Sequence, residues 1–220
     1  PKGTVESLLE EKNRGALTGI LTYHVVAGDV RSKQIVKDKL TTATTLNGQR
    51  LDIAIEEGAV TIDGALVVTA DIVCSNGVIH VIDTVMLPES KNLAEVATAA
   101  GSFKTLLAAA QAAGLVDALP KGGPFTVFAP TDEAFAKLPE GTVATLLKPE
   151  NKGRLAAILK HHIVSGRVYA DQAAKLDKAP TIGGTELAIA ITKDSAKIGN
   201  ANIGATDIES SNGVTHEIDP

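Results

Sequence analysis

Hydrophobic and polar residues alternate along two similar stretches of the chain, and each predicts a β-strand after a tight turn. The stretches are Ser75–Asp83 and Ser211–Asp219. In both, Asn-Gly supplies residues that tolerate the positive φ of a turn, and β-branched residues follow. Side chains of a strand alternate between its faces, so one face carries Val-x-His-x-Ile. We expect that face, with His80 and His216, to lie in the core.

The opposite face of each strand differs between the two stretches. It carries Ile79 and Val81 in the first, but Thr215 and Glu217 in the second. A position that accepts both valine and glutamate is typical of a surface. If the first copy makes a contact that the second lacks, we expect it at Ile79 and Val81.

Helical periodicity and turn residues predict the elements between these strands. Residues 92–99 and 102–113 are predicted helices, the second ending at Gly114. Residues 125–128 are a predicted strand, and Thr131 is the expected N-cap of the following helix. Because helices precede a run of short strands, the order indicates an α+β fold.

An apolar stripe at helical spacing ends at His162, and a matching stripe ends at His24. The neighbouring His161 cannot share a metal ion with His162 easily, since adjacent helical side chains diverge by about 100°. We therefore expect His24, His80, His162 and His216 to be hydrogen-bonded core residues.

Comparison of the chain with itself indicates an uneven tandem duplication. Residues 1–9 match residues 139–147, whereas residues 91–138 have no counterpart in the first copy. A short, polar, proline-marked connection divides the chain into residues 1–90 and 91–220. The first interpretation is a fragment of a longer repeat array, cut out of phase with its domains. The second is that a neighbouring molecule supplies the missing elements.

Composition and motifs narrow the class of function. A net charge of −5 and an aromatic content of 3% disfavour nucleic acid and anionic membranes as partners. No apolar run approaches the ~20 residues of a membrane helix. The single Cys74 is expected to be buried in a strand, and the alternative is a thiol that pairs between molecules. The sequence has no nucleophile elbow, zinc-protease motif or phosphate loop, so we expect no enzyme, cofactor or metal.

Three motifs resemble the fasciclin-like domain family. Residues 125–135, which include Phe128, resemble its first signature box. Residues 76–83 resemble its second box, and residues 212–219 are a weaker copy. Tyr23-His24 and His161-His162 resemble its central tyrosine–histidine motif, although His161 stands where tyrosine is usual. The resemblance covers essentially the whole chain.

The resemblance implies a twisted β-sandwich or wedge of short strands with several packed helices, in tandem. It implies an extracellular, cell-surface or periplasmic adhesion or matrix module, without general catalytic activity, that binds a protein partner or itself. An apolar small-molecule carrier, for a carotenoid or lipid, is the alternative, because some fasciclin-like proteins resemble such binders. A carrier needs a large apolar groove.

An Asp-Ile pair precedes the second box in each copy. Mammalian matrix members of the family carry at this place an adhesion motif read by integrins. By position, Asp71 and Ile72 are the better match, and Asp207 and Ile208 the second. The alternative is structural: the isoleucines pack under the sheet and the aspartates cap a turn.

Overall fold

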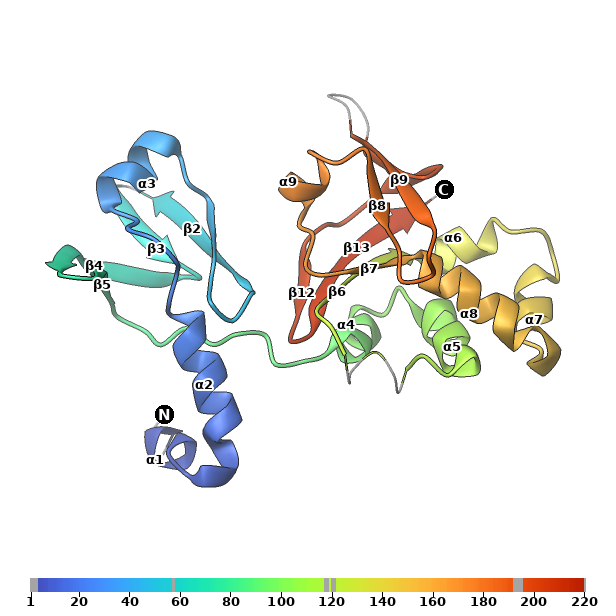
Figure 1. Ribbon diagram of the computed structural model, residues 1–220, viewed down its shortest axis with the longest axis horizontal. Coiled ribbons are helices and arrows are strands. Elements are labelled where there is room, and N and C mark those ends of the chain that lie inside the picture. The colour runs from blue at the N-terminus through green and yellow to red at the C-terminus, as the bar shows by residue number, and fades with distance from the viewer. Residues whose placement is uncertain (1–3, 57, 117–118, 120–121, 192–195, 220) are drawn as a thin grey trace. The chain divides into compact units, whose positions relative to one another are not determined.

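The chain folds into two compact units. The computed structural model describes residues 4–56, 58–116, 119, 122–191 and 196–219. Unit 1 is Pro1–Pro88 and unit 2 is Glu89–Pro220, and each combines helices with a sheet (Figure 1). The predicted α+β class is therefore confirmed. The first residues of the predicted duplication, 1–3, lie outside the described residues.

Unit 1 places its helices ahead of its strands. Its elements are α1 (Thr4–Leu8), η1 (Glu11–Asn13), α2 (Arg14–Tyr23), α3 (Ser32–Asp38), β1 (Thr42–Thr44), β2 (Arg50–Glu56), β3 (Ala59–Ile62), β4 (Ala65–Cys74) and β5 (Gly77–Ile82). Strands β1 to β5 pair in sequence order, each antiparallel to the next. The core against this meander contains Tyr23, Leu51, Ala65 and Met86.

Unit 2 begins with additional helices and a strand. Its elements are α4 (Leu93–Ala100), α5 (Lys104–Ala113), β6 (Phe125–Pro130), α6 (Asp132–Ala136), α7 (Thr142–Leu146), η3 (Pro149–Asn151), α8 (Lys152–His161), β7 (Ile163–Ser165), α9 (Ala170–Ala173), β8 (Lys178–Pro180), β9 (Glu186–Ile191), β10 (Ala196–Ile198), β11 (Ala201–Ile203), β12 (Ile208–Ser210) and β13 (Gly213–Asp219). The two predicted helices and the predicted strand correspond to α4, α5 and β6, and are confirmed. Helices α5 and α8 pack together, and the buried cluster between them contains Ala109, Ala113, Leu155 and Leu159, with Leu115 just beyond the end of α5.

Local capping chemistry sets the ends of these helices. Asn92 accepts a hydrogen bond from the N–H of Glu95 at 3.1 Å, and Glu95 accepts one from the N–H of Asn92 at 2.8 Å. Thr131 Oγ1 accepts from the N–H of Ala134 at 3.2 Å, as expected for an N-cap. Gly114 ends α5 with a φ of 75°, where glycine is favoured.

The sheet of unit 2 is nearly closed into a barrel. Its strand order is β7-β6-β13-β11-β10-β9-β8, and β12 also pairs with β13. Strand β6 runs parallel to β13 and antiparallel to β7, so it lies between them. A bridge between Val164 of β7 and Thr181, just beyond β8, joins the two ends of this order. Phe128, Ile189 and Ile218 are buried in the resulting core.

The surface position predicted for the second face of β13 is wrong. Thr215 is only 4% exposed, and Glu217 is half-buried. The alternation predicted the other face correctly, since Val214, His216 and Ile218 are buried. Both faces are covered because α4 and α6, which come from the segment without a counterpart in unit 1, pack against β13.

The glycine after each Asn serves a different purpose from the one predicted. Neither Gly77 nor Gly213 has φ in the left-handed region. At Gly213, a Cβ atom would lie 2.2 Å from the carbonyl oxygen of Phe125, so the missing side chain lets β6 approach β13. At Gly77, a Cβ atom would meet nothing within 4 Å.

Two residues of unit 1 that were expected in the core are exposed. His24 donates from Nδ1 to the carbonyl of Ile20 at 2.8 Å and accepts from the N–H of Met86 at 3.3 Å, yet it is exposed. Its counterpart His162 is half-buried, because α5 and β6 line the cavity beside it. Cys74 is exposed because it ends β4 at the tip of the β4–β5 hairpin.

Candidate interaction surface

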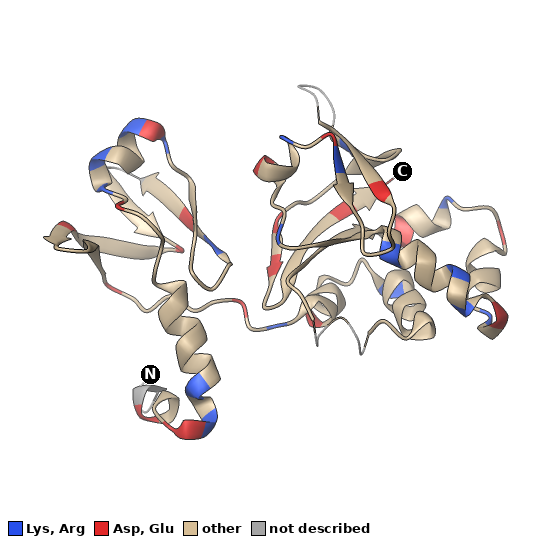
Figure 2. Ribbon diagram, in the orientation of Figure 1, with Lys and Arg blue, Asp and Glu red and all other residues tan. Residues whose placement is uncertain are grey.

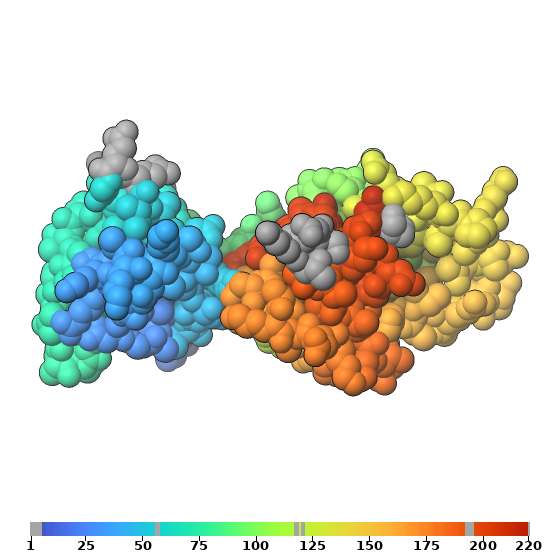
Figure 3. All heavy atoms as spheres, turned by 90° about the horizontal axis from the view of Figure 1, so that it is seen from above, coloured from blue at the N-terminus to red at the C-terminus, as the bar shows by residue number. Residues whose placement is uncertain are grey.

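One face of the β4–β5 hairpin exposes a row of branched apolar side chains, which we call the β4–β5 face. Its members, with their exposed fractions, are Leu66 (38%), Val68 (53%), Ile72 (42%), Ile79 (53%) and Val81 (39%). Val67 and Ile82 pair on the opposite side of the hairpin, towards the core, so these five residues point outward. Figure 3 shows this part of the chain, in teal, at the surface of unit 1.

Residues from two separate sequence predictions lie on this face: Ile72 of the Asp-Ile pair, and the pair Ile79 and Val81. Ile72 lies directly opposite Ile79 in the antiparallel register, and paired residues project to the same side. Val81 follows on the same side of β5. Leu66 and Val68 complete the row and were missed, and two register shifts between Val67 and Ile72 interrupt the alternation along β4.

Asp71 is held beside this face by hydrogen bonds to α3. Its φ of 60° lies in the left-handed region. Its carboxylate accepts from the backbone N–H of Ser32 at 2.9 Å and from the Ser32 hydroxyl. These bonds hold the pKa of the Asp71 carboxyl below its ordinary value. Asp71 thus fixes the backbone that presents Ile72. Ser32 is distant in sequence, so no local pattern could identify it as the partner.

Unit 2 repeats this arrangement, but beneath a helix. Asp207 has a φ of 59°, and its carboxylate accepts from the N–H of Ala170, at the start of α9, at 2.8 Å. Ile208 is half-buried, and α4 packs against β12. Ile72 is therefore exposed in unit 1, whereas its counterpart Ile208 is half-buried in unit 2, and both aspartates are half-buried.

His216 forms hydrogen bonds that connect β13 to neighbouring segments of unit 2. Its Nδ1 accepts the backbone N–H of Asp207 at 3.2 Å, so Nε2 carries the proton and donates to the carbonyl of Val168 at 2.8 Å. The ring is 2% exposed and stacks on Phe128 with 5.4 Å between ring centroids. Burial lowers the pKa of His216 below its ordinary value, which favours this neutral form.

The remaining motif residues also bond within their own units. His80 makes the same kind of bonds as its counterpart in unit 2, but it is only half-buried. The buried Tyr23 donates its hydroxyl proton to Asp63 at 2.6 Å. His162 donates from Nδ1 to the carbonyl of Ile158 at 2.8 Å, and burial lowers its pKa.

The β4–β5 face carries little charge. Figure 2 shows β4 and β5 almost entirely in tan. Asp71 is the charged residue of the two strands, and its carboxylate is directed to Ser32. Exposed apolar side chains gathered on one face in this way are typical of a site for protein–protein contact.

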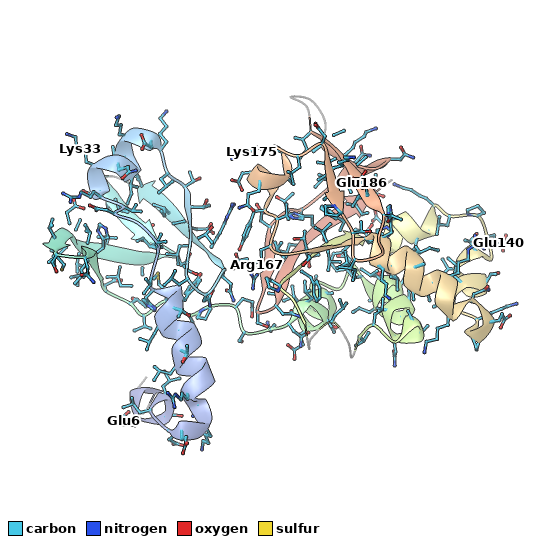
Figure 4. The ribbon with its side chains drawn as sticks, viewed as in Figure 1. Glu6, Lys33, Glu140, Arg167, Lys175 and Glu186 are labelled. Atoms are coloured by element: carbon cyan, nitrogen blue, oxygen red, sulfur yellow. The ribbon has the colours of Figure 1, made fainter. Side chains whose placement is uncertain are left out.

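Unit 2 contains a separate groove between its helices and its sheet. The groove has a volume of about 670 Å³ and lies among α6, α7, α8 and the end of β13. Phe135, Leu155 and Ile158 are among its apolar residues, and Arg154 and Glu140 are its charged ones. Glu140 is labelled in Figure 4. The size suits a small apolar molecule.

Within the described ranges, no group of three or more His, Cys, Asp or Glu side chains is placed to hold a metal ion. No helix in the part of the chain that the structure describes is long and apolar enough to cross a membrane.

Known proteins show which family shares this architecture. The family model of the fasciclin domain matches residues 1–88 and 101–220. Protein sll1483 of Synechocystis sp. is 46% identical over 127 residues, which are 58% of this chain and 70% of that protein. Transforming growth factor-beta-induced protein ig-h3 of Sus scrofa is 31% identical over 100% of this chain, which spans 32% of ig-h3.

A solved structure has the same fold. It is a FAS1 domain pair from the insect cell adhesion molecule fasciclin I, and it aligns over 98% of this chain and 82% of its own with a TM-score of 0.54. At 19% sequence identity, this likeness concerns the fold alone. The family model covers most of the chain, and the motifs that resemble the family lie on the fold described above. The chain therefore belongs to the fasciclin domain family.

Proposed function

We propose that this chain is a non-enzymatic adhesion or matrix module that acts through protein–protein contacts at the cell surface, in the matrix or in the periplasm. The β4–β5 face carries the proposal, because five branched apolar side chains are exposed on it. Membership of the fasciclin domain family supports the same class, since members of this family occur in adhesion and matrix proteins.

The centre of the proposed contact is the pair Ile72 and Ile79. Full burial of a branched side chain contributes roughly 1.5–3 kcal/mol, and the five residues of the face are already about half covered. Covering the rest contributes roughly 1 kcal/mol for each residue. That sum can support a specific contact once the entropic cost of association is offset.

The Asp-Ile pair of unit 1 is the one we propose for partner contact. Ile72 is open, and Asp71 positions it through its bonds to Ser32. Asp207 and Ile208 take second place, because Ile208 is half-buried below α4.

The experiment compares Ile72→Asp and Ile79→Asp with Leu46→Asp. Leu46 is 60% exposed in the turn before β2, outside the β4–β5 hairpin, and serves as the matched control. We expect both variants on the face to reduce self-association in sedimentation velocity and cell attachment to coated protein, while the control leaves both unchanged. Equal behaviour of all three variants would contradict the proposal.

A second candidate function is supported by the groove of unit 2. Its volume of about 670 Å³ and its largely apolar wall fit an apolar small molecule such as a carotenoid or lipid. Visible absorbance that stays with the protein through gel filtration, and that Ile158→Asp removes, would favour this carrier function. A protein that stays colourless after incubation with a carotenoid would argue against a carotenoid carrier.

A further inference from the structure

A cleft opens in unit 1 where strands β3 and β4 separate. Among the described residues, the two strands pair at Thr61 with Leu66 and at Ile62 with Ala65, and beyond Leu66 they take different directions (Figure 1). The space between them lies beside α3 and has a volume of about 580 Å³. We call it the β3–β4 cleft. Its wall comes from both strands and from one face of the helix: Lys33, Val36, Lys37, Val60, Val67 and Ala70.

Hydrogen bonds to the β4–β5 hairpin hold the start of α3 beside this cleft. The backbone N–H of Ser32, the first residue of α3, donates to the Asp71 carboxylate on β4 at 2.9 Å. Just before the helix, the carbonyl of Val30 accepts from Nε2 of His80 on β5 at 2.8 Å. The position of the helix is therefore set within unit 1, and a ligand meets a wall that is already in place.

The β3–β4 cleft combines an apolar floor with two positive charges. Val60 and Val67 are half-buried on the strands, and Val36 of α3 is 57% exposed. Lys33 and Lys37 are four residues apart, so they lie on the same face of the helix as Val36. Lys33 is labelled in Figure 4. Among the described residues, neither ammonium group forms an ion pair with a carboxylate, so both are available to an anionic ligand.

The matched region of unit 2 has different chemistry. At the offset that relates residues 1–9 to 139–147, Asp171 stands where unit 1 has Lys33, and Ala174 stands where it has Val36. Helix α9 is also shorter than α3, with four residues instead of seven. The two units share a fold, so the fold does not require a positive, apolar helix face at this place. Variable surface segments on a shared scaffold are where binding functions concentrate.

We propose that the β3–β4 cleft binds an extended acidic peptide segment of a partner protein, with the pattern acid–apolar–acid. In an extended chain, side chains two residues apart lie on the same side, about 6.5 Å from one another. Residues four apart on a helix are separated by a similar distance, about 6 Å. Two carboxylates of the peptide therefore reach Lys33 and Lys37 together. The apolar side chain between them points the other way, towards Val60 and Val67.

Charge and shape favour a peptide over a membrane or a free fatty acid. The chain has a net charge of −5, so an extended anionic surface is repelled, whereas a short acidic segment can contact the two lysines alone. A fatty acid requires a site that encloses most of its chain. This cleft leaves Val36 and Ala70 exposed instead. The proposal goes beyond the proposed function, because it adds a second contact site that does not depend on the β4–β5 face.

The test is a titration of the full chain with the peptide acetyl-Gly-Glu-Val-Glu-Gly-amide, followed by methyl NMR at low salt. We expect the methyl resonances of Val36, Val60 and Val67 to shift as the peptide binds. Replacing both glutamates of the peptide with glutamine should weaken binding about tenfold, since two exposed ion pairs are lost. Replacing its valine with serine should also weaken binding, because the apolar floor is then left uncovered.

Substitutions in the chain test the same contacts. Lys33→Gln and Lys37→Gln should each weaken binding about threefold, and together about tenfold. Lys175→Gln is the matched control, because Lys175 occupies the position of Lys37 in unit 2 and its loss changes the net charge equally. We expect this control to leave binding unchanged.

Several results would overturn the proposal. These are absent methyl shifts, equal weakening by Lys37→Gln and Lys175→Gln, or equal binding of the glutamine peptide. Sulfated dextran that binds as tightly as the peptide, without any effect of Val36→Ser, would show a non-specific cationic patch and would overturn it too. Failure of the proposed function has a different signature: the peptide binds as expected, yet Ile72→Asp changes neither self-association nor attachment.

Discussion

Replacing Gly213 with alanine should destabilise unit 2 strongly, because the new methyl group has no room. The added Cβ would lie 2.2 Å from Phe125 O and 2.9 Å from Leu93 Cδ1. An ordinary C···O contact needs about 3.2 Å or more, so β6 and β13 must separate by roughly 1 Å. Overpacking of this kind costs about 1–3 kcal/mol. Loss of the bond from Phe125 N–H to Asn212 O would add about 1 kcal/mol.

The expected net loss is therefore about 3 kcal/mol in the free energy of unfolding of unit 2. Urea titration followed by hydrogen exchange of peptides from each unit measures it, because the two units need not unfold together. Gly77→Ala is the matched control and should change unit 1 by less than about 0.5 kcal/mol, or stabilise it slightly by restricting the unfolded chain. Similar losses in both variants would refute the argument that close approach of β6 requires the glycine.

Three further predictions concern side chains within the units. Lowering the pH below the ordinary histidine pKa of 6.5 should reduce the stability of unit 2. The pKa values of His216 and His162 are lowered in the folded state, so the unfolded chain binds more protons at these pH values. A urea midpoint that is constant between about pH 7.5 and 5 would contradict this prediction. Thr131→Ala should cost about 1 kcal/mol by removing the cap of α6, measured by urea unfolding against Thr131→Ser, which keeps the hydroxyl. Tyr23→Phe should lower the melting temperature of unit 1, because it removes the hydrogen bond to Asp63, which contributes about 1 kcal/mol. An unchanged melting temperature would show that this hydrogen bond makes no net contribution to stability.

Local chemistry was enough to predict several elements of unit 2. The hydroxyl of Thr131 and the glycine at 114 mark helix ends through bonds and dihedral angles that involve only nearby residues. The face of β13 with Val214, His216 and Ile218 also followed from the period of two. The resemblance to the fasciclin family, made from three short motifs, is confirmed as well.

The burial of a strand or helix face by elements distant in the sequence could not be predicted from local chemistry. Alternation separates the two faces of a strand, but it does not say what packs on either face. Thr215 is polar and was placed at the surface, yet α4 covers it; His24 ends an apolar stripe and was placed in the core, yet it is exposed. Matched positions such as Ile79 and Thr215 differ in burial because α4, which comes from residues 91–138, packs against β13 in unit 2.

The candidate surface could be predicted only in part, because contacts between segments far apart in the sequence decide which residues share a face. Ile72, Ile79 and Val81 were identified from two separate arguments, and only the strand register shows that they share one face. The role of Gly213 could not be read from its turn, since its neighbour Phe125 is far away along the chain. Asn-Gly is so common in hairpins that local statistics favoured the wrong explanation.

The position of β6 in unit 2 has a consequence for how the chain is made. The meander of unit 1 joins neighbouring strands, so its contacts have low sequence separation and can form as the polypeptide leaves the ribosome. The central pair β6–β13 joins Phe125 to Gly213, and its loop-closure entropy must be overcome before any of that pairing is gained. During synthesis, one edge of β6 therefore stays unpaired until β13, the last strand of unit 2, has been synthesised. In that interval the nascent chain is most open to strand exchange with a neighbour and to aggregation.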